Sequence, residues 1–266
     1  MARYKAGFIG AGSMGGALAL AAAKEAGGGR VAVACSSEER SAQAARRLGC
    51  TAESPETILR ESEFVFLGVK PQMLDGVIGL LAEPLRTSRA VFVSMLAGVS
   101  LDRLERALGA DKKIIRIMPN TPCAVGRGMI LHCANAGVGP QELEEFRALM
   151  SGAGALDAID ERLIDAATAI SGCGPAYAYL FIEALADGGV KAGLPRDKAL
   201  RCAAQMLLGS AELALRSGKH PGELKDEVCS PGGSTIAGVA ALESAGFRGA
   251  CIAAVEAAVE RTRQLG

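Results

Sequence analysis

The sequence contains no tryptophan, and aromatic residues make up only 4% of its 266 positions. It has two histidines, and its eight cysteines are scattered without a Cys-x-x-Cys pair, so neither a metal-site spacing nor a disulfide framework is indicated. Lysine plus arginine and aspartate plus glutamate balance at 29 each, which excludes a dominant nucleic-acid-binding role. These shortages predict a protein with no metal ion and no nucleic-acid partner.

Two further absences concern location. No uninterrupted apolar run is long enough to span a bilayer, because glycines and charges break each candidate. The N-terminal residues lead directly into a strand-like segment and show no signal-peptide pattern. We therefore expect a cytoplasmic protein with no membrane partner.

The sequence is rich in apolar residues, which make up 50% of it, and in glycine, with 34 residues. In the first half, short β-rich runs alternate with helical patterns. The predicted strands are 6–9, 31–35, 64–69, 90–94 and 114–118, and the predicted helices are 14–26, 37–48, 73–81 and 101–108. This alternation predicts an α/β fold in which residues 1–157 form a Rossmann-like, doubly wound parallel sheet. In such sheets the ligand binds at the carboxyl ends of the strands.

The second half, residues 158–266, reads as an all-helical domain. The predicted helices are 160–169, 175–191, 195–216, 222–228, 234–245 and 248–264. Several are apolar around most of their circumference, which suits burial across a subunit interface. We therefore expect a homodimer formed through this domain.

A glycine-rich motif follows the first predicted strand and opens the first predicted helix. It consists of Gly10, Gly12 and Gly15, with Ser13 and Met14 between the last two. The first glycine permits a tight turn, the second lets a pyrophosphate approach the backbone, and the third allows close packing of helix and strand. Because the strand and the helix are both present, we expect these five residues to bind a dinucleotide.

The choice of cofactor should depend on the residues that follow the second strand. NAD enzymes usually place an acidic residue there, whereas this chain has Ser36 and Ser37, with Arg40 nearby. Two hydroxyls and a guanidinium suit a 2′-phosphate, so the pattern favours NADP(H) over NAD(H). Ser37 could instead only cap the next helix, and Glu38 or Glu39 could still reach a ribose.

Three more strand ends should face the same crevice and contact the cofactor. The residues concerned are Val69, Lys70 and Pro71, then Met95, Leu96 and Ala97, and finally Asn120. Pro119 and Pro122 should hold a rigid turn that presents Asn120 near the nicotinamide.

Two glycine-rich interruptions stand out in the helical half. They are Ser171–Tyr177 (SGCGPAY) and Ser230–Thr235 (SPGGST). The second resembles a nest of backbone N–H groups at a helix N-terminus, which suits a carboxylate, and the Thr235 hydroxyl could reach a substrate heteroatom. An ordinary capped loop explains the spacing equally well.

Taken together, these motifs resemble those of the pyrroline-5-carboxylate reductase family over nearly the whole chain. The matching stretches are Gly7–Gly15 (GFIGAGSMG), Phe66–Gln72 (FLGVKPQ), Met118–Pro122 (MPNTP), Ser171–Tyr177, His220–Thr235 (HPGELKDEVCSPGGST) and Ala240–Arg248 (AALESAGFR). The resemblance implies reduction of Δ1-pyrroline-5-carboxylate to L-proline by hydride from NAD(P)H, the last step of proline biosynthesis. It also implies a homodimer, assembled in many members into a decamer of five dimers.

The resemblance further implies a substrate site between the nucleotide domain of one subunit and helices of its partner. Gly232, Gly233, Ser234 and Thr235 would hold the substrate carboxylate, and the Thr235 hydroxyl would face the imine nitrogen. No metal, nucleophile or catalytic histidine is required. One departure concerns Glu53–Glu56, where many members have an asparagine that meets the cofactor.

Two other functions remain as alternatives. A β-hydroxyacid dehydrogenase-like oxidoreductase needs a general acid or base, commonly a lysine about one helical turn after a glycine-rich segment, and none follows Gly174 before Lys191. A non-catalytic nucleotide-sensing module would bind the cofactor without turnover, and it leaves the loop Ser230–Thr235 unexplained.

Overall fold

A computed structural model describes residues 2–264. The chain divides into two compact units. Unit 1 runs to Cys173 and includes the chain again from Ala258, and unit 2 is Gly174–Ala257.

Unit 1 is built on one eight-stranded sheet in the order β3-β2-β1-β4-β5-β6-β7-β8. The strands are β1 (Tyr4–Ile9), β2 (Val31–Ala34), β3 (Thr51–Ala52), β4 (Ser62–Leu67), β5 (Val91–Ser94), β6 (Lys113–Met118), β7 (Gly128–Ala134) and β8 (Gly154–Ala158). Neighbours pair in parallel except β6 and β7, which are antiparallel. The strand order reverses at β1 and β4, and such a switch point is where open α/β sheets bind ligands.

The five predicted strands are confirmed as β1, β2, β4, β5 and β6. The sequence analysis missed β3, β7 and β8. Strand β3 has two residues, and β8 (GALDA) is largely exposed. Strand β7 begins with a glycine and contains His132, so it lacks the continuous apolar run that marks a buried strand. The expected parallel sheet is thus confirmed for β1 to β6, and it is extended by two strands of opposite direction, β7 and β8.

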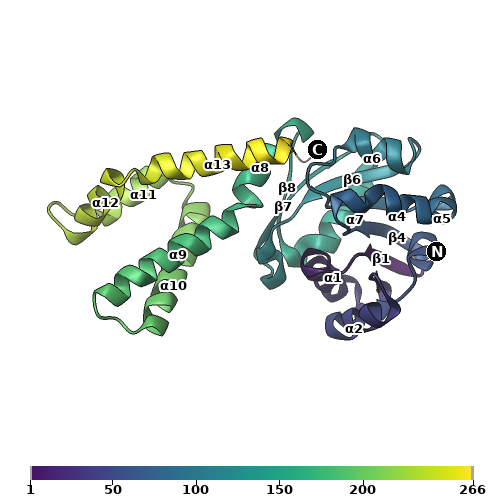
Figure 1. The fold of residues 1–266 in the computed structure, drawn as a ribbon, viewed down its shortest axis with the longest axis horizontal. Helices are drawn as coiled ribbons and strands as arrows, with labels where there is room; N and C mark the ends of the chain where they lie inside the picture. The colour runs from purple at the N-terminus through teal and green to yellow at the C-terminus, as the bar shows by residue number, and fades with distance from the viewer. Residues whose placement is uncertain (1, 265–266) are drawn as a thin grey trace. The chain divides into compact units, whose positions relative to one another are not determined.

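Helices cover both faces of this sheet (Figure 1). They are α1 (Ser13–Ala26), α2 (Glu38–Leu48), α3 (Pro55–Glu61), α4 (Leu74–Leu80), α5 (Ala82–Thr87), α6 (Leu101–Leu108), α7 (Pro140–Met150) and α8 (Glu161–Ser171). Alternate strand residues point to opposite faces, so two separate cores form. One, under α1, α2 and α7, contains Phe8 and Phe66, whose ring centroids are 4.3 Å apart. The other, under α3 to α6, contains Phe92 and Leu104.

Helix α8 packs against β6 and β7. Its Ile164 is fully buried against Met118 of β6 and Leu131 of β7. The predicted boundary between residues 157 and 158 precedes this helix, whereas the structure groups α8 with the sheet. The division of the whole chain into domains 1–157 and 158–266 therefore stays a prediction.

Unit 2 is entirely helical in its described residues. It comprises α9 (Gly174–Lys191), α10 (Arg196–Ser217), α11 (Pro221–Val228), α12 (Ser234–Ser244) and most of α13 (Phe247–Arg263), close to the predicted ranges. Helices α9 and α10 lie side by side (Figure 1). Gly193 lies in the turn between them with a φ of +97°, a conformation that glycine adopts without strain.

One described segment, Glu161–Lys191, is apolar and long enough to cross a membrane by length and composition alone, and the bent pair α12 and α13 would count as a second. The sequence analysis did not expect such a segment. It is weak evidence for a membrane, because a helix buried in a protein interior or interface has the same composition.

Candidate functional site

The glycine-rich turn lies at the switch point of the sheet. Gly10 follows β1 with a φ of +100°, and Gly12 is the N-cap residue of α1, where no described side chain makes a capping hydrogen bond. A Cβ atom at Gly15 would lie 2.1 Å from the Gly10 carbonyl oxygen, so helix and turn touch through their backbones. A Cβ at Gly12 would meet no described atom within 4 Å. The free N-terminus of α1 is therefore open to an anion.

Gly68, at the end of β4, completes this backbone contact. A Cβ atom there would lie 2.3 Å from the Gly10 carbonyl oxygen, and a Cβ at Gly10 would lie 2.5 Å from the Gly68 carbonyl oxygen. The backbones that follow β1 and β4 thus leave no room for a side chain at Gly10 or Gly68. Gly68 matters for packing rather than for chemistry, because it holds the turn in place.

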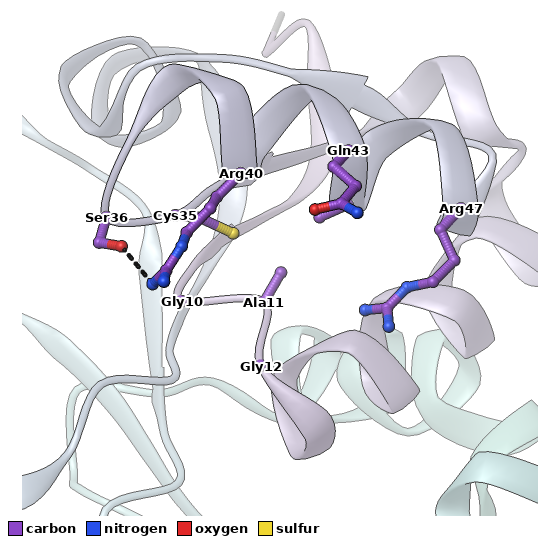
Figure 2. Close-up of a pocket in the computed structure, with 9 residues that line it drawn as sticks. Gly10, Ala11, Gly12, Cys35, Ser36, Arg40, Gln43 and Arg47 are labelled. Atoms are coloured by element: carbon purple, nitrogen blue, oxygen red, sulfur yellow. Dashed lines mark hydrogen bonds between the residues drawn. The ribbon is translucent and has the colours of Figure 1, made fainter.

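The residues after β2 form the opposite wall of a cavity of about 410 Å³ (Figure 2). Ser36 Oγ accepts a hydrogen bond of 3.1 Å from Arg40 Nη1, and both residues line this cavity. Ser37 is the N-cap of α2 and accepts a 3.3 Å hydrogen bond from the Arg40 backbone N–H. The capping role considered for Ser37 is therefore present.

Sequence reasoning missed two residues of this wall, Gln43 and Arg47. They lie three and seven positions after Arg40, the spacing of one helix face, and this signal could have identified them. With Gly10–Gly12 opposite, the cavity has a backbone cradle on one side and two guanidinium groups on the other (Figure 2). This arrangement fits the phosphates of a dinucleotide.

The other predicted strand ends lie along the same edge of the sheet. Val69 and Lys70 follow β4, and Pro71 begins a short 3₁₀ helix. After β5, the Leu96 side chain is buried in the core, so only its backbone could contact a cofactor. Pro71 and Ala97 line a second cavity, of about 830 Å³.

The Asn120 side chain makes two hydrogen bonds within unit 1. Its amide nitrogen donates a 2.9 Å hydrogen bond to the Ser171 carbonyl oxygen, and its amide oxygen accepts one of 2.9 Å from the Met129 backbone N–H. The residue is also buried. Its side chain thus joins the end of β6 to β7 and to the last residue of α8. A contact between Asn120 and a nicotinamide stays a prediction.

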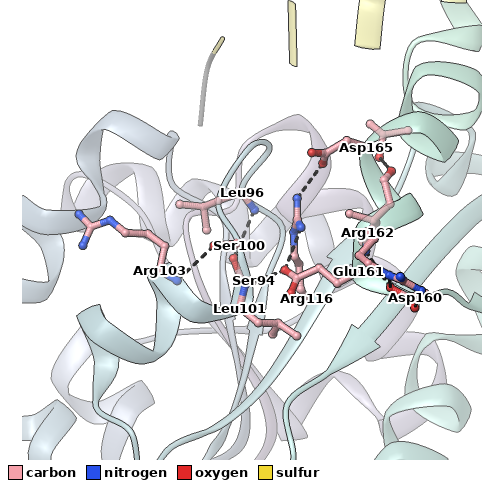
Figure 3. Close-up of polar contacts among 12 residues, drawn as sticks. Ser94, Leu96, Ser100, Leu101, Arg103, Arg116, Asp160, Glu161, Arg162 and Asp165 are labelled. Atoms are coloured by element: carbon pink, nitrogen blue, oxygen red, sulfur yellow. Dashed lines mark hydrogen bonds and ion pairs between the residues drawn. The ribbon is translucent and has the colours of Figure 1, made fainter. Parts of the chain in front are cut away.

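A buried arginine fixes the other end of α8. Arg116 of β6 is 3% exposed, and its two terminal nitrogens each donate a 3.0 Å hydrogen bond, one to Glu161 and one to Asp165 (Figure 3). Glu161 also accepts a 2.7 Å hydrogen bond from the Leu101 backbone N–H at the start of α6. The cluster connects α6, β6 and α8 beneath the segment that follows β5.

The four residues predicted to bind substrate lie together at the start of α12. Gly232 has a φ of +67°, Gly233 is the N-cap, and Ser234 and Thr235 begin the helix. No described side chain caps this N-terminus. The first backbone N–H groups of α12 are therefore available to an anion, beside the exposed Thr235.

The described residues show no metal-binding cluster, and two of the cysteines are protonated thiols. No group of three or more His, Cys, Asp and Glu side chains there could hold a metal ion. Burial raises the pKa of Cys50 and of Cys133 to about 11, so both thiols are protonated at neutral pH.

Comparisons with known proteins agree with this geometry. Residues 161–265 match the family model for pyrroline-5-carboxylate reductase dimerisation, and residues 5–98 match the model for NADP oxidoreductase, coenzyme F420-dependent. The chain is 44% identical to a pyrroline-5-carboxylate reductase of Pisum sativum, covering 98% of this chain and 96% of that protein. It is 51% identical to one of Synechocystis, covering 77% and 76%.

A solved structure shows the same fold throughout. The Plasmodium falciparum pyrroline carboxylate reductase with NADP bound superposes with a TM-score of 0.89 at 34% identity, covering 100% of this chain and 99% of that one. The doubly wound α/β fold followed by a helical region is therefore confirmed.

Proposed function

Because the chain belongs to the pyrroline-5-carboxylate reductase family, we infer that it is an NAD(P)H-dependent oxidoreductase that reduces Δ1-pyrroline-5-carboxylate to L-proline, the last step of proline biosynthesis. We propose that unit 1 holds the cofactor at the carboxyl edge of its sheet. We also propose that the glycine loop before α12 holds the substrate carboxylate.

The observation that carries the substrate site is the uncapped N-terminus of α12. Free N–H groups and the positive end of the helix dipole favour a carboxylate at this point. Gly232 supplies the turn with its positive φ, and a Cβ atom at Gly233 would lie 2.3 Å from Ser230 Oγ, so the Ser230 side chain would have to move to admit one. With the carboxylate held by Gly233 and Ser234, the ring is oriented by its one charged substituent.

For this reaction the protein mainly has to orient the substrate relative to the cofactor. Bound NAD(P)H supplies the hydride. The imine nitrogen must be protonated when the C=N bond is reduced, and the Thr235 hydroxyl is the group we assign to that nitrogen, as a hydrogen-bond partner that orients the ring or relays the proton. Neither a nucleophile nor a metal ion is needed for this reaction.

We propose NADP(H) as the preferred cofactor. The Ser36 hydroxyl and the Arg40 guanidinium, already in contact at 3.1 Å, support a 2′-phosphate site at the edge of the cavity. Replacing Arg40 by alanine should weaken NADPH binding more than NADH binding, measured as the ratio of the two dissociation constants. Equal weakening would remove Arg40 from the discrimination.

The helical region supports oligomerisation, because it matches a dimerisation family and leaves many apolar side chains exposed. We propose a homodimer formed by this region, a decamer of five dimers, and a cytoplasmic location. Burial in the dimer would also explain the apolar composition of Glu161–Lys191.

The test of the function is oxidation of NADPH and NADH with pyrroline-5-carboxylate, beside a 2-keto acid. We expect turnover with the cyclic imine alone. Turnover of the keto acid would favour a β-hydroxyacid dehydrogenase, and cofactor binding without turnover would favour a nucleotide sensor.

Two variants of Thr235 test its role. Thr235→Val removes the hydroxyl at nearly constant volume and should lower kcat/KM about a hundredfold, the scale of one proton-transfer group. Thr235→Ser keeps the hydroxyl and should retain most activity. Cofactor affinity should be the same in both, and an unchanged rate in the valine variant would exclude Thr235 from the mechanism.

A further inference from the structure

One face of α2 presents two arginines to the cavity beside the glycine-rich turn. Arg40, Gln43, Ala44 and Arg47 all line this cavity, and their spacing places them on a single helix face. In Figure 2 the Arg47 side chain extends from α2 toward the Gly10–Gly12 turn. Its Nη2 atom lies 3.4 Å from where a Cβ of Gly16 would be, which places the guanidinium against the first turns of α1.

Among the described residues, neither arginine of this face forms a salt bridge. Arg40 donates to the uncharged Ser36 Oγ, and no carboxylate of the described residues forms a salt bridge with Arg40 or Arg47. The second cavity shows the opposite pattern: Arg103 is bound by Asp75 and Arg106 by Asp102, at 2.6 and 2.8 Å. Of these two cavities in the described part of the chain, the one at α2 is the cavity whose arginines have no carboxylate partner and are available for a ligand.

The positions of these two guanidinium groups indicate which phosphate of the cofactor they contact. The glycine turn and the free N-terminus of α1 already provide for the pyrophosphate. The α-carbons of Arg40 and Arg47 are about 10.5 Å apart along the helix axis, at 1.5 Å per residue, and two arginine side chains can converge over this distance. The Arg47 side chain extends from α2 into the same cavity that Arg40 and Ser36 line. The remaining dianionic group of NADP is the phosphate monoester on the adenosine ribose.

From this we propose that Arg47 is a second specificity-determining arginine, which binds the 2′-phosphate together with Arg40. The inference rests on the proposed NADP(H) site and extends it to a residue two helical turns away. It assigns the discrimination between NADP and NAD to a pair of guanidiniums rather than to the loop after β2 alone.

Arg46 provides a matched control for the test. It is adjacent to Arg47 in the last turn of α2, is exposed, and does not line the cavity. Replacing either arginine by alanine removes one positive charge near the same helix end, so the two variants change the net charge and the helix-dipole interaction equally. A difference in ligand affinity between the two variants therefore indicates that Arg47 contacts the ligand.

The measurement is calorimetric titration of the full-length assembled protein with NADP⁺, NAD⁺, adenosine 2′-monophosphate and adenosine 5′-monophosphate. We expect Arg47→Ala to raise the dissociation constants of NADP⁺ and adenosine 2′-monophosphate about tenfold, the scale of one charge-assisted hydrogen bond. NAD⁺ and the 5′-monophosphate should change less than twofold, and Arg46→Ala should leave all four unchanged. Arg47→Lys, which keeps the charge but loses the fork geometry, should be intermediate.

Equal weakening of NAD⁺ and NADP⁺ in Arg47→Ala, or the same result in Arg46→Ala, would overturn the proposal. So would unchanged binding in Arg47→Ala. These outcomes are distinguishable from failure of the proposed function, because the NADH-dependent reduction of pyrroline-5-carboxylate by the unaltered protein tests the function without the 2′-phosphate.

Discussion

The two units of this chain bury their apolar residues very differently. Unit 1 encloses two continuous cores, one on each face of its sheet. Among the described residues of unit 2, only Ala186, Ala199 and Ala203 are buried, while large side chains such as Leu180 and Leu208 are exposed. A sheet covered by helices satisfies its hydrophobic surface within one chain, whereas these helices need a further surface. The difference indicates that unit 1 buries its apolar residues within itself, whereas the apolar faces of unit 2 are of the kind that oligomerisation covers.

The largest effect should come from the core of unit 1. Phe66→Ala removes a fully buried ring stacked on Phe8, and it should lower the free energy of unfolding by about 3–5 kcal/mol, measured by urea denaturation. Phe247→Ala in unit 2, where the ring is partly exposed, should cost much less at a protein concentration that favours monomer. Equal losses would mean that unit 2 has a core of its own.

The next prediction concerns the exposed face of unit 2. Leu180→Lys introduces a charge on α9 at a side chain that is 68% exposed, and it should shift the protein from dimer to monomer in sedimentation velocity. Leu80→Lys is the matched control, because Leu80 is 86% exposed on α4 of unit 1. We expect the control to keep the oligomeric state. A dimer that survives Leu180→Lys would place the interface elsewhere.

A smaller effect is expected where α8 joins the sheet. Arg116→Met leaves Glu161 and Asp165 without their shared partner, and it should cost about 2 kcal/mol of unfolding free energy. Arg103→Met is the control, because it removes the partner of Asp75 in an exposed ion pair. It should lower the free energy of unfolding far less. If both variants lost the same stability, the burial of Arg116 would have no energetic consequence.

The smallest effect is a pH dependence in unit 1. Burial, with a contribution from Arg147, lowers the pKa of His132 below its ordinary value of 6.5, and Asp157 opposes this shift. The unfolded chain therefore binds more protons just below pH 6.5, so stability falls as the pH drops through this range and levels off below the folded-state pKa. His132→Gln should make the loss between pH 7 and pH 5 shallower, measured as the melting temperature against pH. An unchanged slope would assign the loss to other groups.

The sequence predicted the parts of the fold that repeat a local signal. The strands β1, β2, β4, β5 and β6 are short apolar runs, and the helices of unit 2 follow from long helical patterns between glycines and prolines. The strands β3, β7 and β8 were missed, because they are short, exposed or interrupted by polar residues. Their formation depends on a neighbouring strand, which a local pattern does not contain.

In the candidate site, too, the sequence predicted the residues with a local signal and missed those whose role depends on distant neighbours. The glycines of the first turn and the loop before α12 were found because positive φ values and close backbone approach demand particular residue types. Arg47 was missed although its spacing from Arg40 places both on one helix face, because an arginine on a helix surface has many possible roles until its neighbours are known. For Asn120, only the structure shows that its side chain bonds to Ser171 and Met129.

The order of residues alone determined where backbones must turn tightly and which segments are apolar, since both are properties of neighbouring positions. Which strands pair, which guanidiniums lack a carboxylate, and which helix faces have no cover were decided by tertiary structure. These depend on groups that are distant in the chain and close in space, and the strength of charge and burial is set by that proximity.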